Sequence, residues 1–218
     1  MHHRIRVWDL PTRLFHWVLV LLVVGLVISG EIGGAAILWH ARLGHAVLAL
    51  LIFRLLWGVW GGHWSRFSTF VRGPVTIWRY LRGSGGPALG HNPLGALSVL
   101  ALLLLLLSQV GTGLMSDDEI AFTGPLAQFV PGTVVSAATA WHKGWGKVLL
   151  LALIGLHISA VVFYMRVKKH NLVVAMLHGD QVSHAPQPAS RDDLYSRLLG
   201  LLSLLCAAAL ALWVYRLM

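Results

Sequence analysis

The sequence is poor in cysteine and in charged residues, and both shortages exclude classes of protein. Its single cysteine, Cys206, allows no disulfide within the chain. No C-x-x-C-H motif occurs, so no c-type haem is attached to this chain. Charged residues make up 11% of the 218 residues and hydrophobic residues 57%. This composition excludes an ordinary soluble globular domain and indicates an integral membrane protein.

Long apolar runs are what the sequence has in abundance. Five of them approach the length of about 20 apolar residues that a membrane-spanning helix needs. These are Leu14–Gly30, Leu38–Gly61, Leu94–Leu114, Trp141–Met165 and Leu198–Val214. The first is longer than the apolar part of a typical signal peptide and no A-x-A site follows it, so we expect a retained span. The predicted fold class is all-α, a four-helix transmembrane bundle with an additional C-terminal transmembrane helix.

Positive charge is concentrated in alternate loops. One set of loops carries Arg4, Arg6, Arg13, Arg66, Arg72, Arg79, Arg82, Arg166, Lys168, Lys169, Arg191 and Arg197. The opposite loops and the C-terminus carry Arg42, Lys143, Lys147 and Arg216. Because cytoplasmic loops are rich in Lys and Arg, we expect a bacterial inner-membrane protein with a cytoplasmic N-terminus and a periplasmic C-terminus. The basic residues sit beside spans and form no separate domain, so no nucleic-acid partner is expected.

Histidines in the apolar runs require an explanation, because ionisable residues inside a bilayer are rare and usually functional. His16 lies near the cytoplasmic end of the first run, and His40 lies at the outer end of the second. His142 and His157 lie near the two ends of the fourth run. If that run is one continuous helix, these two residues are roughly 22 Å apart along it and about 60° apart around it. Antiparallel packing then pairs His16 with His157 and His40 with His142.

Two imidazoles on opposite sides of an iron porphyrin make a six-coordinate haem suited to electron transfer. A lone membrane histidine is more often a packing residue, but four at matching depths favour ligands. The sequence therefore predicts two haem b groups, one towards each membrane face. Gly44 and Gly146 each follow a predicted outer ligand by four residues, where we expect a gap for a macrocycle. His45 lies about 140° from His40 around the helix and is the reserve ligand.

Other residues receive less specific predictions. Arg54 lies roughly 21 Å deeper than His40 on nearly the same face, and we interpret it as a partner of a haem propionate or a quinone. Ser108 and Gln109 are the polar groups of the third run, which we assign to packing. Interfacial or loop positions are expected for His63, His91, His170, His178 and His184. Residues 1–180 are expected to form the di-haem domain, 181–197 a cytoplasmic linker and 198–218 the fifth helix.

Several short motifs resemble the bacterial cytochrome b561 family, which includes the b-type cytochrome subunits of nickel–iron hydrogenases. They are RLFHW around His16, His40 with Gly44 and with Arg54 before LLWG, WHKG around His142, IGLHIS around His157, and the following KKHNL. The resemblance covers roughly residues 4–177 and implies that the four histidines ligate two haems b. The two histidines of the fourth run are fifteen residues apart where the family usually has fourteen. A π-bulge absorbs the extra residue, or else His142 is turned.

The resemblance also implies electron transfer between the quinone pool and a periplasmic redox protein, a c-type cytochrome or a hydrogenase. The acidic residues Asp117, Asp118 and Glu119 lie in an outer loop and are a predicted docking surface for such a partner. A homo-oligomer is compatible with the sequence.

Two alternatives stay open. One is an enzyme that oxidises superoxide and reduces quinone, with Arg42, Lys143 and Lys147 attracting the anion. The other is a histidine-lined transporter of metal ions or protons, although intramembrane carboxylates are lacking.

Overall fold

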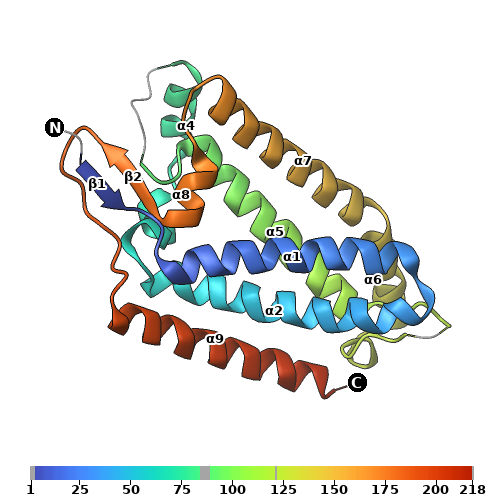
Figure 1. Ribbon diagram of the computed structural model, residues 1–218. Helices are drawn as coiled ribbons and strands as arrows, with labels where there is room; N and C mark the ends of the chain where they lie inside the picture. The colour runs from blue at the N-terminus through green and yellow to red at the C-terminus, as the bar shows by residue number, and fades with distance from the viewer. Residues whose placement is uncertain (1–2, 84–88, 121, 218) are drawn as a thin grey trace. The chain divides into compact units, whose positions relative to one another are not determined.

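The protein is built almost entirely from α-helices. The computed structural model describes residues 3–83, 89–120 and 122–217. Within these residues five segments are helical, long and apolar enough to cross a membrane (Figure 1). They are Leu10–Ile32, Gly34–Trp60, Pro93–Met115, Gly132–Arg166 and Leu194–Tyr215. The predicted fold class, an all-α multi-pass membrane protein with five spans, is confirmed.

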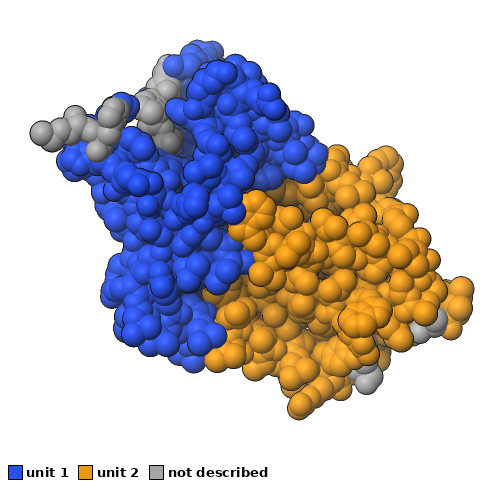
Figure 2. All heavy atoms as spheres, in the orientation of Figure 1, with its two compact units in different colours: residues 1–15, 54–101, 155–203 blue, residues 16–53, 102–154, 204–218 orange. Residues whose placement is uncertain are grey.

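The elements follow one another along the chain as labelled in Figure 1. They are β1 (His3–Arg6), α1 (Leu10–Ile32), η1 (Gly34–Ala36), α2 (Ile37–Trp60), η2 (His63–Ser65), α3 (Phe67–Phe70), α4 (Pro74–Leu81), α5 (Pro93–Met115), η3 (Ala127–Phe129), α6 (Gly132–Lys143), α7 (Trp145–Arg166), α8 (Leu172–His178), β2 (Asp180–Ser183) and α9 (Leu194–Tyr215). Contacts group these elements into two compact units (Figure 2). Unit 1 contains residues 1–15, 54–101 and 155–203, and unit 2 contains residues 16–53, 102–154 and 204–218.

Helix α1 begins in unit 1 with a buried carboxylate. Asp9 is completely buried, and its Oδ1 accepts the backbone N–H of Thr12 at 2.8 Å, as an N-cap residue does. The same carboxylate accepts the Ser65 hydroxyl at 2.8 Å and the Trp57 indole N–H at 3.1 Å. Asp9 therefore caps this helix, and Pro11 lies in its first turn. The cap also connects α1 to the end of α2 and to the η2 turn.

A small antiparallel sheet in unit 1 joins the N-terminal segment to residues 180–183, and the sequence did not predict it. Strands β1 and β2 pair His3 with Ser183 and Arg6 with Asp180 (Figure 1). Residues 181–183 of the expected linker are therefore strand. The fifth helix starts at Leu194, earlier than expected, because the Asp193 carboxylate accepts the Ser196 N–H at 2.8 Å and caps it.

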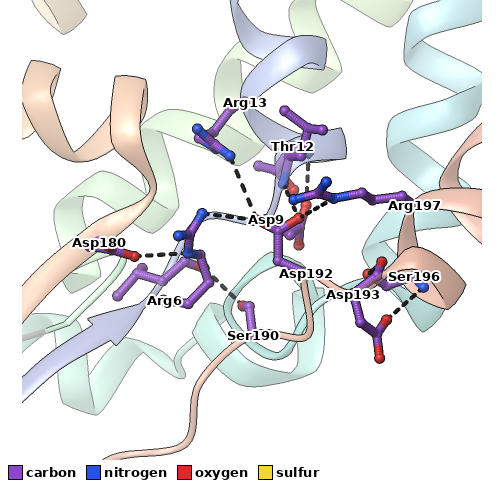
Figure 3. A network of polar contacts seen from close by, with 12 residues as sticks. Arg6, Asp9, Thr12, Arg13, Asp180, Ser190, Asp192, Asp193, Ser196 and Arg197 are labelled. Carbon is purple, nitrogen blue, oxygen red and sulfur yellow. Dashed lines mark hydrogen bonds and ion pairs between the residues drawn. The ribbon is translucent and has the colours of Figure 1, made fainter.

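Asp192 is the centre of an ion-pair network that attaches the start of α9 to the start of α1 (Figure 3). Its side chain is 9% exposed and lies 2.9 Å from Arg6 Nη1, 3.2 Å from Arg197 Nε and 3.6 Å from Arg13 Nη2. The backbone N–H of Leu10 also donates to Asp192, at 3.2 Å. A carboxylate with this many donors stabilises the surrounding arginines as well as the helix start.

Helix α9 makes further contacts within unit 1. The Trp60 indole N–H donates to the Ser203 hydroxyl at 3.2 Å. A Cβ on Gly200 would lie 2.8 Å from Pro11 Cγ, so glycine allows close packing of α9 against α1. The first part of α9, up to Ser203, is therefore an integral part of this unit, while its remaining residues belong to unit 2.

The fourth span is not the single continuous helix that we expected. Helix α6 ends at Lys143, Gly144 adopts φ −100° and ψ −114°, and α7 begins at Trp145. A Cβ on Gly144 would lie 2.6 Å from the Ala140 carbonyl oxygen, which explains the glycine. The prediction of one helix is wrong at this residue, and a break takes the place of the proposed π-bulge. His142 therefore lies on α6, and His157 lies on α7.

Replacing Asp192 by Asn should destabilise the protein, because three arginines would lose their buried carboxylate. We expect Asp192→Asn to lower the free energy of unfolding by about 2 kcal/mol. The neighbouring variant Asp193→Asn is the matched control, since asparagine also caps helices and the ion pair of Asp193 is with the exposed Arg191. Thermal unfolding in detergent, followed by tryptophan fluorescence, measures both. Equal midpoints for the two variants would show that the network contributes nothing.

Candidate functional site

Unit 2 brings together two of the four predicted ligands. His40 of α2 and His142 of α6 have ring centroids 5.9 Å apart, and their planes are nearly perpendicular at 89°. Both rings come from the ends of their helices, as the depths of these residues in the sequence predicted. The pair offers two imidazole rings close enough together to be suited to binding a metal centre.

Backbone carbonyls fix the protonation of both rings. His40 Nδ1 lies 3.0 Å from the Leu26 carbonyl oxygen, and His142 Nδ1 lies 2.8 Å from the Gln109 carbonyl oxygen. A carbonyl only accepts, so each Nδ1 carries the proton and each Nε2 keeps its lone pair. This tautomer is the one that a histidine needs in order to ligate iron through Nε2.

Glycines on the neighbouring helices make room for these rings. A Cβ on Gly30 of α1 would lie 3.2 Å from the His40 ring, and a Cβ on Gly113 of α5 would lie 2.9 Å from His142 Cε1. Sequence reasoning missed both residues. Their signal in the sequence is glycine within a leucine-rich span, which often marks close approach of another group.

The two glycines expected to leave a gap for a macrocycle differ. At Gly44 a Cβ would have no heavy atom within 4 Å, so space is open one turn beyond His40 as expected. At Gly146 a Cβ would collide with the side-chain oxygen of Gln109. The expectation of a gap at Gly146 is therefore wrong, because the Gln109 amide fills that position.

His45 lies in a different environment from His40. It is buried, its Nδ1 is 2.8 Å from the Ala41 carbonyl oxygen, and its ring packs edge-on against Tyr215 at 5.1 Å. The separation agrees with the 140° angle between the two residues around the helix. Its role as reserve ligand stays a prediction.

The other predicted pair is divided between the units. His16 of α1 belongs to unit 2, and His157 of α7 belongs to unit 1. Each is half-buried, and the His16 ring packs edge-on against Trp17 with centroids 5.0 Å apart. The pairing of His16 with His157 stays a prediction.

Arg54 is buried in unit 1, where protein groups surround it. Its Nη1 donates to the Ser65 carbonyl oxygen at 3.0 Å, and its guanidinium lies 4.8 Å from the Phe67 ring centroid. It also interacts electrostatically with the Asp9 carboxylate. A buried arginine with these partners is compensated without a ligand. The propionate or quinone role of Arg54 stays a prediction.

His91 is more buried than its loop position indicated. Its ring packs between Trp8 and Phe70, with centroids 4.7 Å from each. Its Nδ1 is buried and has no hydrogen-bond partner among residues 3–83, 89–120 and 122–217. Burial, with contributions from the charges of Arg54 and His157, lowers the pKa of His91 to about 3. His91 is therefore neutral at physiological pH. The packing of several elements creates this environment, so its burial could not be predicted from the sequence.

The cationic residues proposed to attract superoxide are partly occupied by other contacts. Lys147 Nζ lies 2.9 Å from the Glu31 carboxylate, and the Arg42 guanidinium lies 5.1 Å from the Trp39 ring centroid. Among the described residues, no group of three or more His, Cys, Asp or Glu is placed to hold a metal ion. The donors that the structure does assemble are the two imidazoles of His40 and His142. Two neutral imidazoles with protonated Nδ1 atoms fit the axial positions of an iron porphyrin.

The comparison with protein families agrees with this chemistry. The model of the prokaryotic cytochrome b561 family matches residues 7–179, which include four of the five spans and all four predicted histidine ligands. No curated protein and no solved structure matched the chain. Strand β2 and helix α9 lie beyond the family match. The chain belongs to the prokaryotic cytochrome b561 family, and it is a multi-pass membrane cytochrome that binds b-type haem and transfers electrons.

Proposed function

We propose that the chain holds two haems b and passes electrons between a periplasmic redox protein and membrane quinone. His40 and His142 hold one haem, and His16 and His157 hold the other. The observation that carries this proposal is the first pair, whose rings lie 5.9 Å apart with each Nδ1 hydrogen-bonded to a backbone carbonyl. We place the protein in a bacterial inner membrane with the N-terminus in the cytoplasm, as the distribution of arginine and lysine favours.

The residues of the pair have defined tasks. The Leu26 and Gln109 carbonyls orient the rings and raise the basicity of the Nε2 atoms. His40 and His142 would hold the haem iron through their Nε2 atoms. The haem, when bound, supplies reversible one-electron chemistry at its iron. Apolar helices around the rings exclude water, which tunes the reduction potential.

The acidic loop after α5 is the proposed docking surface for the periplasmic partner. The Asp117 carboxylate accepts the Glu119 N–H at 2.7 Å, and the Asp118 carboxylate accepts the N–H groups of Ile120 and Phe122 at 3.0 and 2.8 Å. These bonds shape the turn, whereas Glu119 is exposed. Negative charge on such a turn steers a basic partner towards it.

Single substitutions test the ligands. We expect His40→Ala and His142→Ala each to lose one of two haems per chain, because one axial bond and its supporting hydrogen bond disappear. His45→Ala, a buried histidine one turn from His40, is the matched control and should keep both. A dithionite-reduced minus oxidised spectrum with haem quantified per chain provides the measurement. Wild-type protein without haem would overturn the proposal, and haem loss in His45→Ala with retention in His142→Ala would reassign the ligand.

Charge reversal at the exposed acid tests the docking surface. We expect Glu119→Lys to slow electron exchange with a basic c-type cytochrome by about threefold at low salt, because steering depends on complementary charge. The difference should vanish at about 0.5 M salt, where charges are screened over a few ångströms. Stopped-flow mixing measures the rate of electron exchange. The rate of Glu119→Gln should lie between the rates of the wild-type protein and Glu119→Lys. A rate that is unchanged at low salt would remove the docking hypothesis.

A further inference from the structure

Gln109 of α5 contacts the ligand His142 at two places. Its carbonyl oxygen accepts the ring Nδ1–H at 2.8 Å, and its side-chain Nε2 donates to the His142 carbonyl oxygen at 3.2 Å. One residue thus holds both the ring and the peptide of the ligand. Sequence analysis assigned this glutamine to packing.

The break at Gly144 explains why His142 offers its carbonyl. Helix α6 ends at Lys143, so the His142 carbonyl is among the last four of that helix, which have no partner within it. A buried carbonyl without a donor is costly, and the Gln109 amide supplies the donor. The Gln109 amide therefore satisfies a carbonyl that the break at Gly144 leaves without a partner in its own helix.

Gly146 provides the space that the amide occupies. A Cβ at this position would collide with Gln109 Oε1 and lie 2.7 Å from the Trp141 indole nitrogen. Gln109 Oε1 is buried and has no hydrogen-bond partner in the part of the chain that the structure describes. A leucine, the commonest residue of this span, would avoid that cost. The unpaired oxygen therefore favours a functional reason for glutamine over a packing reason.

We propose that Gln109 is a positioning residue that sets the orientation and basicity of the haem ligand His142. This inference rests on the proposed function. Gln109 lies on the far side of the imidazole from Nε2 and acts only through the histidine. By holding the peptide, its side chain keeps the ring where Nδ1 meets the carbonyl. Loosening the peptide weakens that bond and makes Nε2 a poorer donor to iron.

Gln109→Met tests the side chain, because methionine has similar length, lacks the amide and leaves the backbone carbonyl in place. We expect the haem at His142 to shift to a higher reduction potential, since a less basic ligand stabilises ferric iron less. Transfer of that haem to apomyoglobin should become about tenfold faster. The other haem should keep its potential. Ser108→Ala, on the preceding residue of the same helix, is the control and should change neither quantity.

Gly146→Ala tests the same arrangement without altering Gln109. Its methyl group would displace the amide, so the potential and the transfer rate should change in the same direction as in Gln109→Met. Gly132→Ala is the matched control, because a Cβ there meets no atom within 4 Å. This second variant also decides the question if Gln109→Met does not fold.

The outcomes separate the two proposals. If the wild-type protein holds no haem that His142→Ala loses, the proposed function and the positioning role are both overturned. Wild-type protein with two haems, whose potentials and transfer rates are unchanged in Gln109→Met or in Gly146→Ala, would overturn the positioning role alone. A higher potential and faster transfer of one haem in both variants would support it.

Discussion

The hydrogen bond from a histidine Nδ1 to a backbone carbonyl is the interaction on which the site in unit 2 depends. It decides which nitrogen carries the proton, and it does so for His40 through Leu26 and for His142 through Gln109. Helical carbonyls reach these rings only where neighbouring helices approach closely, and Gly30 and Gly113 permit that approach. Backbone packing in apolar helices thus creates a polar site with defined chemistry.

Unit 1 follows the same rule with carboxylates in place of imidazoles. Asp9 is completely buried and accepts three hydrogen bonds, while Asp192 lies among three arginines. Buried charges are tolerated only when donors surround them. Asp192 belongs to the segment beyond the family match, and yet it joins the first residues of α1. The segment around Asp192 is therefore built into the fold of this unit.

Hydropathy alone was enough to predict five spans, because a bilayer requires long apolar helices. The depths of His40 and His142 were enough to predict their meeting, because antiparallel neighbours place equal depths side by side. The break at Gly144 was not predicted, because the stretch His142–Lys147 was interpreted as the start of one continuous helix. The sheet of β1 with β2, the burial of His91 and the double contact of Gln109 each depend on residues distant in sequence. The side chain that fills the space at Gly146 was also not predictable, because a glycine in the sequence does not show which neighbouring side chain lies against it.

The central claim is that His40 and His142 ligate one iron from opposite sides with their rings nearly perpendicular. Perpendicular imidazoles leave two iron d orbitals close in energy, which makes the ferric low-spin signal strongly anisotropic. Electron paramagnetic resonance of the oxidised protein is therefore the most direct measurement. The account predicts a strongly anisotropic low-spin signal that disappears in His142→Ala. A high-spin signal in the wild-type protein, or a low-spin spectrum unchanged by that substitution, would contradict it.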